Sequence, residues 1–344
     1  MYMSHSVPFL KGVIPVITAP DFDKKQIVFV FAKEGERLRL KNGNIVVLDA
    51  NEKVKLQVSC YRLFIVYIVG HLSITTSVIE QAKKFGFFFA LFSPTFRLND
   101  LIGAHKDGNT LLKEKQYFYH DLEIAKHLVK NKIYAQTTLL NEQRMKSEYT
   151  KKTIQTLKEY YSQIDNQTDR HSIMAYEGLS SKIYFRAHFN NLPWQGRQPR
   201  IKKDWINSAL DIGYTVLFSF VESLLCAFGF DTYIGVLHTQ FYMRKSLTCD
   251  LVEPFRPMID KTVKVCYNLK EMKESDFIVV NHQYRLSWQQ SPKYISLFMK
   301  TILENKKEVF SYIQQYYRCF MRNADINEYP FYKKGEKLGG FNQL

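Results

Sequence analysis

The chain has 344 residues, of which 46% are hydrophobic and 15% aromatic, so it can hold two domains and is too apolar to be disordered overall. Its 48 Lys and Arg residues outnumber its 33 Asp and Glu residues, which gives a formal net charge of +15. This surplus favours a partner with many negative charges, such as a nucleic acid or, less strongly, an anionic membrane surface.

The apolar segments argue against a membrane span. The runs Leu63–Val69 and Phe87–Phe92 are much shorter than the ~20 residues that a spanning helix needs. The longer segment Gly213–Gly229 carries Glu222 near its middle, which is typical of a buried helix in a soluble domain. The N-terminal segment has no basic stretch followed by a long apolar core and a cleavage site, so we expect a cytoplasmic protein.

The cysteines indicate no disulfide framework and no zinc site. There are five of them, widely spaced and without a C-x-x-C pair. An odd, scattered set of this kind is typical of reduced, buried thiols in the cytosol.

The first third of the chain predicts strands. Leu38 and Leu40 alternate with charged residues, and Asn42-Gly43 supplies a hairpin turn signal. A helix is predicted near Thr75–Lys84. The predicted strands are Ile27–Phe31, a pair on either side of the Asn-Gly turn, Val54–Val58, Leu63–Val69 and Phe87–Phe92.

Helical periodicity replaces this pattern from Lys115 onward, after a break at Asn99–Asn109. The predicted fold class is therefore α+β, with a mainly antiparallel β domain in residues 1–100 and a larger all-α domain in residues 101–344. The helical segments are Tyr117–Tyr161, His171–Asn190, Trp205–Phe228, Ser246–Leu269 and Lys293–Phe320.

Three segments of the helical part could carry chemistry. In the first, Glu177 shares a helix face with Ser180, Ser181 and Tyr184. A carboxylate among hydroxyls can bind a metal, although spacing alone favours a solvated surface residue. In the second, His238 follows a short apolar run. Taken alone, a histidine in this setting is more often a packed side chain than a metal ligand.

The third segment runs from Ser246 to Pro257. Asp250 and Glu253 are three residues apart, so they are expected on one side of a helix, and Pro254 predicts a kink. Two nearby carboxylates repel each other unless a cation lies between them. The pair is explained equally well if both carboxylates face water and interact favourably with the dipole of the helix.

Together these segments resemble the CRISPR-associated integrase of the adaptation step, the universal spacer-acquisition endonuclease family. The resemblance is carried by four motifs in the family's order and spans roughly residues 115–320. The motifs are E-G-x-x-S-x-x-Y-F at Glu177–Phe185, a Gly-Tyr helix at Asn207–Leu217, G-F-D-x-x-x-G-x-L-H at Gly229–His238, and S-L-x-x-D-L-x-E-P-F-R-P at Ser246–Pro257.

The resemblance implies that Glu177, His238 and Glu253 bind Mg²⁺ or Mn²⁺, with Asp250 as a further essential carboxylate. The implied reaction is attack by the 3′-hydroxyl of spacer DNA on a phosphodiester of the repeat array, or hydrolysis when water replaces that hydroxyl. Basic residues beside these motifs are candidate DNA contacts: Arg197, Arg200, Lys202, Lys203, Arg244 and Lys245.

The family likeness also implies partners, namely double-stranded DNA, a second copy bound through the β domain, and a small ferredoxin-like adaptation protein. Two other functions remain open from the residues alone. One is a structure-selective, metal-dependent DNA repair nuclease that uses the same side chains. The other is a catalytically silent DNA-binding scaffold, in which Glu177 or His238 could be replaced without loss.

Overall fold

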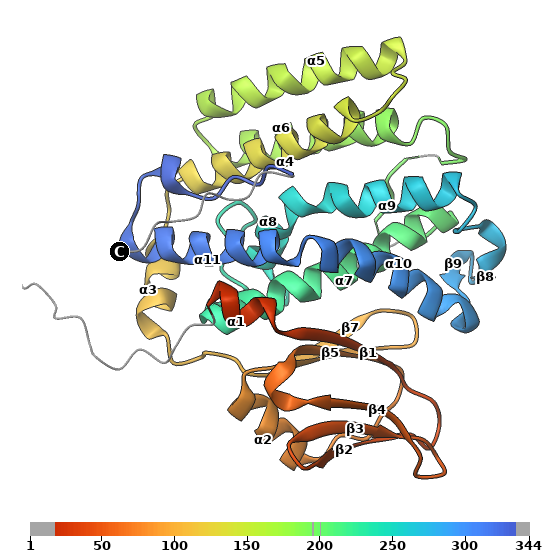
Figure 1. Ribbon diagram of the computed structural model, residues 1–344. Coiled ribbons are helices and arrows are strands. Elements are labelled where there is room, and N and C mark those ends of the chain that lie inside the picture. The colour runs from red at the N-terminus through yellow and green to blue at the C-terminus, as the bar shows by residue number, and fades with distance from the viewer. Residues whose placement is uncertain (1–17, 195, 200, 335–344) are drawn as a thin grey trace, which may run out of the picture.

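The computed structural model describes residues 18–194, 196–199 and 201–334. Figure 1 shows two sheets at one end of the molecule and helix α5 at the other. The predicted α+β class is confirmed. The strands are β1 (Gln26–Phe31), β2 (Arg37–Lys41), β3 (Asn44–Leu48), β4 (Val54–Ser59), β5 (Leu63–Val69), β6 (Phe88–Phe92), β7 (Leu98–Gly103), β8 (Phe277–Val280) and β9 (Gln283–Leu286).

The N-terminal strands form two sheets. β2, β3 and β4 make an antiparallel sheet, and β2 and β3 are joined by the predicted turn, in which Asn42 and Gly43 have φ of 49° and 71°. The second sheet has the order β1-β5-β6-β7. Its β1–β5 and β5–β6 pairs are parallel because β2–β4 and helix α2 (Thr76–Phe85) form the crossovers, and only β6–β7 is antiparallel.

The mixed sheet is buried on both faces, which explains why β5 is apolar at every position. One face packs against the antiparallel sheet and α2. The other packs against α7 (Trp205–Phe228), where the Phe64 and Phe220 rings meet edge to face at 6.1 Å and the Tyr67 hydroxyl donates to the Val216 carbonyl at 3.5 Å. One apolar core therefore joins the β domain to the helices.

The helices follow the predicted order, with breaks inside three of the predicted segments. The helices not yet named are α1 (Ala19–Asp23), α3 (Thr110–Phe118), α4 (Glu123–Asn141), α5 (Glu148–Gln163), α6 (Arg170–His188), α8 (Ser246–Val252), α9 (Arg256–Asn268), α10 (Ser291–Glu304) and α11 (Lys306–Arg322). Helix α7 is long and apolar enough to cross a membrane, but 83% of that window is buried inside the protein. Its Glu222 lies in the interior, as predicted.

The region around Pro254 shows why one predicted helix is two. The segment Glu253–Phe255 is a 3₁₀ turn (η3) between α8 and α9, since Pro254 cannot donate to the α-helical ladder. A second predicted helix, Lys293–Phe320, is interrupted at Asn305, where α10 ends and α11 begins.

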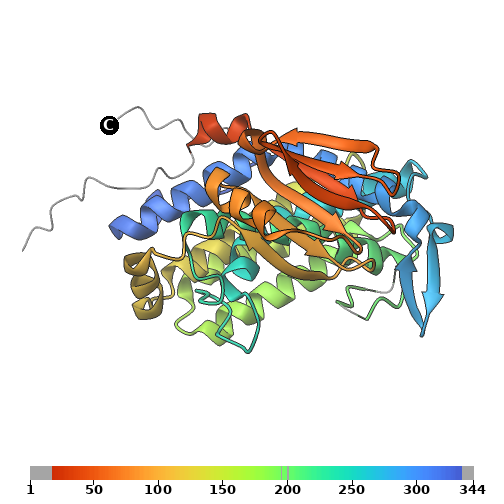
Figure 2. The same cartoon turned by 90° about the horizontal axis from the view of Figure 1, so that it is seen from below.

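Two sets of strands were missed by the sequence prediction. β7 overlaps the segment Asn99–Asn109, which the sequence indicated to be irregular. It was missed because it pairs along one side only and because Asn99, Asp100 and Gly103 break the alternation of apolar and polar residues. The β8–β9 hairpin was missed because its two turn residues, Asn281 and His282, lack the usual glycine although both have positive φ. The hairpin projects from the edge of the molecule (Figure 2).

The cysteines agree with the prediction. All five are free, and four of them are buried.

Candidate metal centre

Three charged side chains from separate segments meet where α4, α6 and the η3 turn pack together. They are Lys132 from α4, Glu177 from α6 and Glu253 from η3. The Lys132 ammonium contacts the Glu177 carboxylate and lies 2.6 Å from Glu253 Oε2. Two carboxylates that are distant in sequence therefore share one cationic atom.

The cluster is shielded from solvent. The Lys132 and Glu253 side chains are each 8% exposed, and that of Glu177 is 20% exposed. Arg256 adds a second cation, with Nη2 at 3.2 Å from Glu253 Oε1. Buried carboxylates require compensation of this kind, because removal from water penalises their charged form.

The cations keep the cluster ionised. Burial alone would raise the pKa of Glu253, but Arg256, Lys132 and His238 outweigh it, so the pKa of this carboxyl falls below its usual range. Burial would likewise lower the pKa of Lys132, but Glu177 and Glu253 outweigh it and raise the pKa.

His238 is near enough to the cluster to help lower the pKa of Glu253, and Asp250 orients its ring. Its Nδ1 is 2.6 Å from Asp250 Oδ1. Asp250 also accepts the backbone N–H groups of Val236, Leu237 and His238 at 2.7, 3.0 and 3.1 Å, so it fixes both the loop and the ring. Because the Asp250 contact uses Nδ1, the opposite nitrogen, Nε2, is the one left for a ligand.

This geometry corrects one expectation about the acidic pair. Asp250 and Glu253 do not point to a common partner, since the 3₁₀ turn begins between them. Asp250 holds the His238 loop, whereas Glu253 faces Lys132 and Arg256. Asp250 is therefore a positioning residue in this arrangement.

Glu177, Glu253 and His238 have the side-chain chemistry that a divalent metal ion requires. Across the described ranges, no three His, Cys, Asp or Glu side chains form a ready-made metal shell. Lys132 instead lies between Glu177 and Glu253, which shows that the two carboxylates can share a cation. A histidine whose Nδ1 is held by a carboxylate is a common metal ligand, and carboxylate oxygens suit Mg²⁺ and Mn²⁺.

The predicted DNA contacts have different surroundings. Arg197 is largely buried, with Nη2 at 2.6 Å from Asp211 Oδ1 and its guanidinium over the Tyr214 ring. Lys245 is paired with the buried Glu222 of α7. Neither is a freely exposed cation, contrary to what the clustering of basic residues in the sequence had suggested.

The other four predicted contacts divide as follows. Lys203 is exposed, while Lys202 is half-buried and has its pKa lowered by burial. Arg244 donates to the Thr239 carbonyl at 2.6 Å and so braces the loop after His238. Arg200 lies outside the described residues.

Sequence reasoning missed Lys132 and Arg256. Lys132 carries a detectable signal, because it lies on the buried stripe of α4 with Leu128, Val129 and Ala135, where a charge requires a buried partner. Arg256 is part of the E-P-F-R-P motif, but only the packed turn shows that its guanidinium reaches Glu253.

A second buried carboxyl, that of Asp260, lies near Arg256 of the cluster. Asp260 accepts hydrogen bonds from the hydroxyls of Tyr184, at 2.8 Å, and Tyr214. Burial raises the pKa of Asp260 from 3.8 to about 6, although both tyrosines and the nearby Arg197 and Arg256 act to lower it. Its neutral form is therefore favoured by the native protein at mildly acidic pH.

Replacing Asp260 with Asn should remove a pH dependence of stability. Because the native pKa is the higher one, the native state binds more protons between pH 4 and 6, and wild-type stability should fall across that range. The shift of about two units corresponds to roughly 3 kcal/mol. Urea unfolding at several pH values measures this effect. The free energy of unfolding of D260N, relative to that of wild type, should rise by about that amount between pH 4 and pH 6. A difference that does not change with pH would contradict the prediction.

Comparison with known proteins identifies the family. The sequence profile described as "CRISPR associated protein Cas1" matches residues 29–300. A CRISPR-associated endonuclease Cas1 from Thermodesulfovibrio yellowstonii is 30% identical over 264 residues, which cover 73% of this chain and 82% of the relative. A protein of the same description from Saccharolobus solfataricus is 28% identical, covering 76% of each chain.

Solved structures share the fold. A casposase bound to integration product has a TM-score of 0.75 at 19% identity, covering 91% of this chain and 96% of that one. A chain of a Cas6-RT-Cas1–Cas2 complex has a TM-score of 0.78 at 20% identity, and this chain spans 36% of that longer one. The sequence profile and the sequence relatives place the protein among CRISPR-associated proteins. It belongs to the Cas1 family, as the four sequence motifs predicted.

Proposed function

We propose that this protein is a divalent-metal-dependent DNA endonuclease and integrase that inserts spacer DNA into a CRISPR array. Its relatives are named endonucleases, and one neighbour of the same fold is a casposase bound to integration product. The proposed setting is the cytoplasm. The β domain expected in residues 1–100 extends to the end of β7 at Gly103, and the catalytic part follows it.

The observation that carries the proposal is the convergence of Glu177 and Glu253 on one cation, next to His238. The carboxylates come from α6 and the η3 turn, and the histidine comes from the loop before α8. An amphipathic helix face would not need a buried and a half-buried carboxylate at one point. A site that binds Mg²⁺ or Mn²⁺ does need them.

The protein's own residues orient and protect this site. Asp250 holds the proton on Nδ1 of His238, so that Nε2 remains a base, and Arg256 holds the second oxygen of Glu253. When bound, the ion would polarise a phosphodiester and stabilise the charge that develops on its oxygens. The packing of α4 against α6 keeps most bulk water away from the carboxylates.

The function can be tested with a supercoiled plasmid that carries a repeat array and a short duplex labelled at its 5′ end. With Mg²⁺ or Mn²⁺, the label should become covalently joined to a repeat boundary, and a 3′-dideoxy duplex should abolish joining. Cleavage without joining in either metal would indicate the repair-nuclease alternative. Neither reaction, with DNA binding retained, would indicate a silent scaffold.

DNA binding is proposed to use the basic residues near the site. Among those that the structure describes, Lys203 is exposed, whereas Arg197 is paired with Asp211. Each phosphate contact contributes about 0.9 to the slope of log affinity against log salt.

K203A should therefore reduce that slope by about one unit without changing thermal stability. The control is K53A, which removes an exposed lysine at the far sheet. Fluorescence anisotropy at several salt concentrations measures both slopes. Equal slopes for K203A and wild type would remove Lys203 from the DNA path.

The proposed assembly is a homodimer formed through the β domain, with a small ferredoxin-like adaptation protein as a further partner. A structural neighbour is named as a Cas1–Cas2 complex with additional domains, which supports a protein partner. Light scattering of the purified protein, alone and with such a partner, would measure the stoichiometry.

A further inference from the structure

The segment Tyr329–Lys334 lies along α4, far from it in sequence. The His127 ring nitrogen Nε2 is 2.9 Å from the Pro330 carbonyl. Asn131, which is fully buried, donates to the Tyr332 carbonyl at 2.9 Å and accepts the Tyr332 N–H at 2.8 Å. We call this segment the C-terminal strap.

The strap touches the two elements that carry the metal centre. Asn131 immediately precedes Lys132, the residue that bridges Glu177 and Glu253. The Tyr332 ring packs edge to face on Phe255 at 4.8 Å, and Phe255 belongs to the same 3₁₀ turn as Glu253. One strap residue therefore connects the Lys132 region of α4 to the Glu253 turn.

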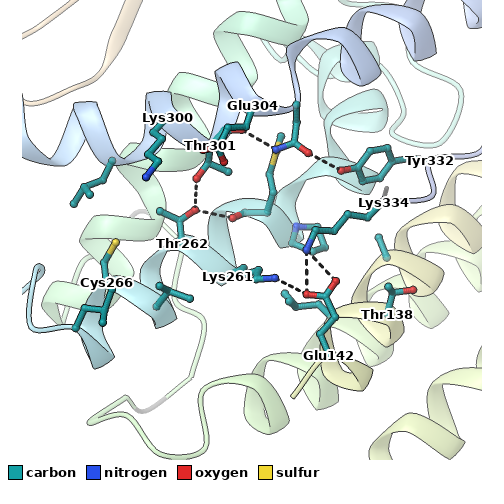
Figure 3. A pocket seen from close by; sticks show the side chains of 18 of the residues that line it. Thr138, Glu142, Lys261, Thr262, Cys266, Lys300, Thr301, Glu304, Tyr332 and Lys334 are labelled. Carbon is teal, nitrogen blue, oxygen red and sulfur yellow. Dashed lines mark hydrogen bonds and ion pairs between the residues drawn. The ribbon is translucent and has the colours of Figure 1, made fainter. Parts of the chain in front are cut away.

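The opposite side of the strap is less closely packed. A cavity of about 500 Å³ lies beside it, lined by α4, α9, α10, Tyr332 and Lys334 (Figure 3). At the rim, Lys334 and Lys261 both pair with Glu142, near the end of α4. The strap thus makes several of its polar contacts with α4 and packs on η3. Its other contacts include a 3.4 Å hydrogen bond from the Tyr332 hydroxyl to Asn305 and the Tyr329–Tyr316 ring pair, and its α9–α10 side borders the cavity.

We infer that the C-terminal strap positions the metal centre, with Asn131 and Tyr332 as positioning residues that hold α4 and the Glu253 turn at a fixed separation. The inference rests on the proposed function, because it concerns the same site. The paired bonds of Asn131 fix the strap on α4, and the Tyr332 ring fixes it on Phe255. Without either contact, the turn that carries Glu253 loses one of its packing partners.

The test compares two disrupting variants with two matched controls. N131A removes both backbone bonds, and Y332L removes the ring while keeping apolar bulk. Y332F keeps the ring, and K334A removes the solvent-accessible ion pair between the strap and Glu142 at the end of α4. All are studied as full chains, at temperatures where circular dichroism shows them folded.

The first readout is Mn²⁺ affinity without DNA, measured by electron paramagnetic resonance. Loss of groups that orient metal ligands costs about 10- to 100-fold in affinity. N131A and Y332L should weaken binding by at least about tenfold, with Y332F and K334A within about twofold of wild type. If the strap had a structural role alone, N131A and Y332L would have lower melting temperatures but the same Mn²⁺ affinity as wild type when folded. That result would overturn the inference.

The second readout is independent of metal. Hydrogen exchange should accelerate in peptides covering residues 248–258 in N131A and Y332L, and should not change in α5. Unchanged exchange there would overturn the inference even if wild type bound no Mn²⁺. Failure of wild type to bind Mn²⁺, together with faster exchange in the variants, would reject the proposed function and keep the positioning role.

Discussion

Replacement of Glu177 by Gln should lower the rate of metal-dependent DNA cleavage and joining by about 100-fold or more while the protein stays folded. Even groups that only orient a metal ligand contribute 10- to 100-fold, so the loss of a ligand carboxylate should cost at least as much. The amide keeps the shape of the side chain, and Lys132 retains its contact with Glu253. Single-turnover kinetics in Mg²⁺ and Mn²⁺ would measure the effect.

The matched control for E177Q is E123Q. Glu123 is also a carboxylate paired with a lysine, Lys126 at 3.0 Å, but it lies at the exposed start of α4. E123Q should cleave and join DNA at nearly the wild-type rate. A similar loss of activity in both variants, or no loss in E177Q, would contradict the assignment of Glu177.

Replacement of Asp250 should separate its two roles, in folding and in orienting His238. D250A leaves three buried backbone N–H groups without an acceptor, at about 1–3 kcal/mol each, so unfolding should become easier by about 3 kcal/mol or more. Urea denaturation measures that loss. The alanine also frees the His238 ring, so activity should fall together with stability.

D250N should keep much of the stability and still lose activity. Its amide oxygen can accept the Val236 and Leu237 N–H groups, which places the amide nitrogen against Nδ1 of His238. That contact favours the tautomer with the proton on Nε2, which cannot then bind a metal. Nitrogen NMR of His238 would show the tautomer; an active D250N with the proton still on Nδ1 would contradict the positioning role.

The sequence predicted most of the fold because its patterns are locally strong. The Asn42-Gly43 turn, the continuous apolar run of β5 and the helix Trp205–Phe228 each appear as predicted. The elements that were missed lack such signals. The turn of the β8–β9 hairpin has no glycine, and β7 is paired on one side only and lacks a regular alternation of apolar and polar residues.

The candidate site was predictable only in part, for a physical reason. The motifs identify Glu177, His238, Asp250 and Glu253, but a motif does not say which side chains share a partner. The assignment of Asp250 to the His238 loop depends on three backbone bonds across the packed structure. The role of the strap depends on Asn131 and Tyr332, which are 201 residues apart in sequence.

A Mn²⁺ titration of the wild-type protein, E177Q and H238A, followed by electron paramagnetic resonance without DNA, measures whether Glu177 and His238 hold the ion. We expect one bound ion in the wild type and at least about tenfold weaker binding in each variant, since each loses a ligand. Unchanged Mn²⁺ affinity in both variants would show that Glu177 and His238 do not hold the ion.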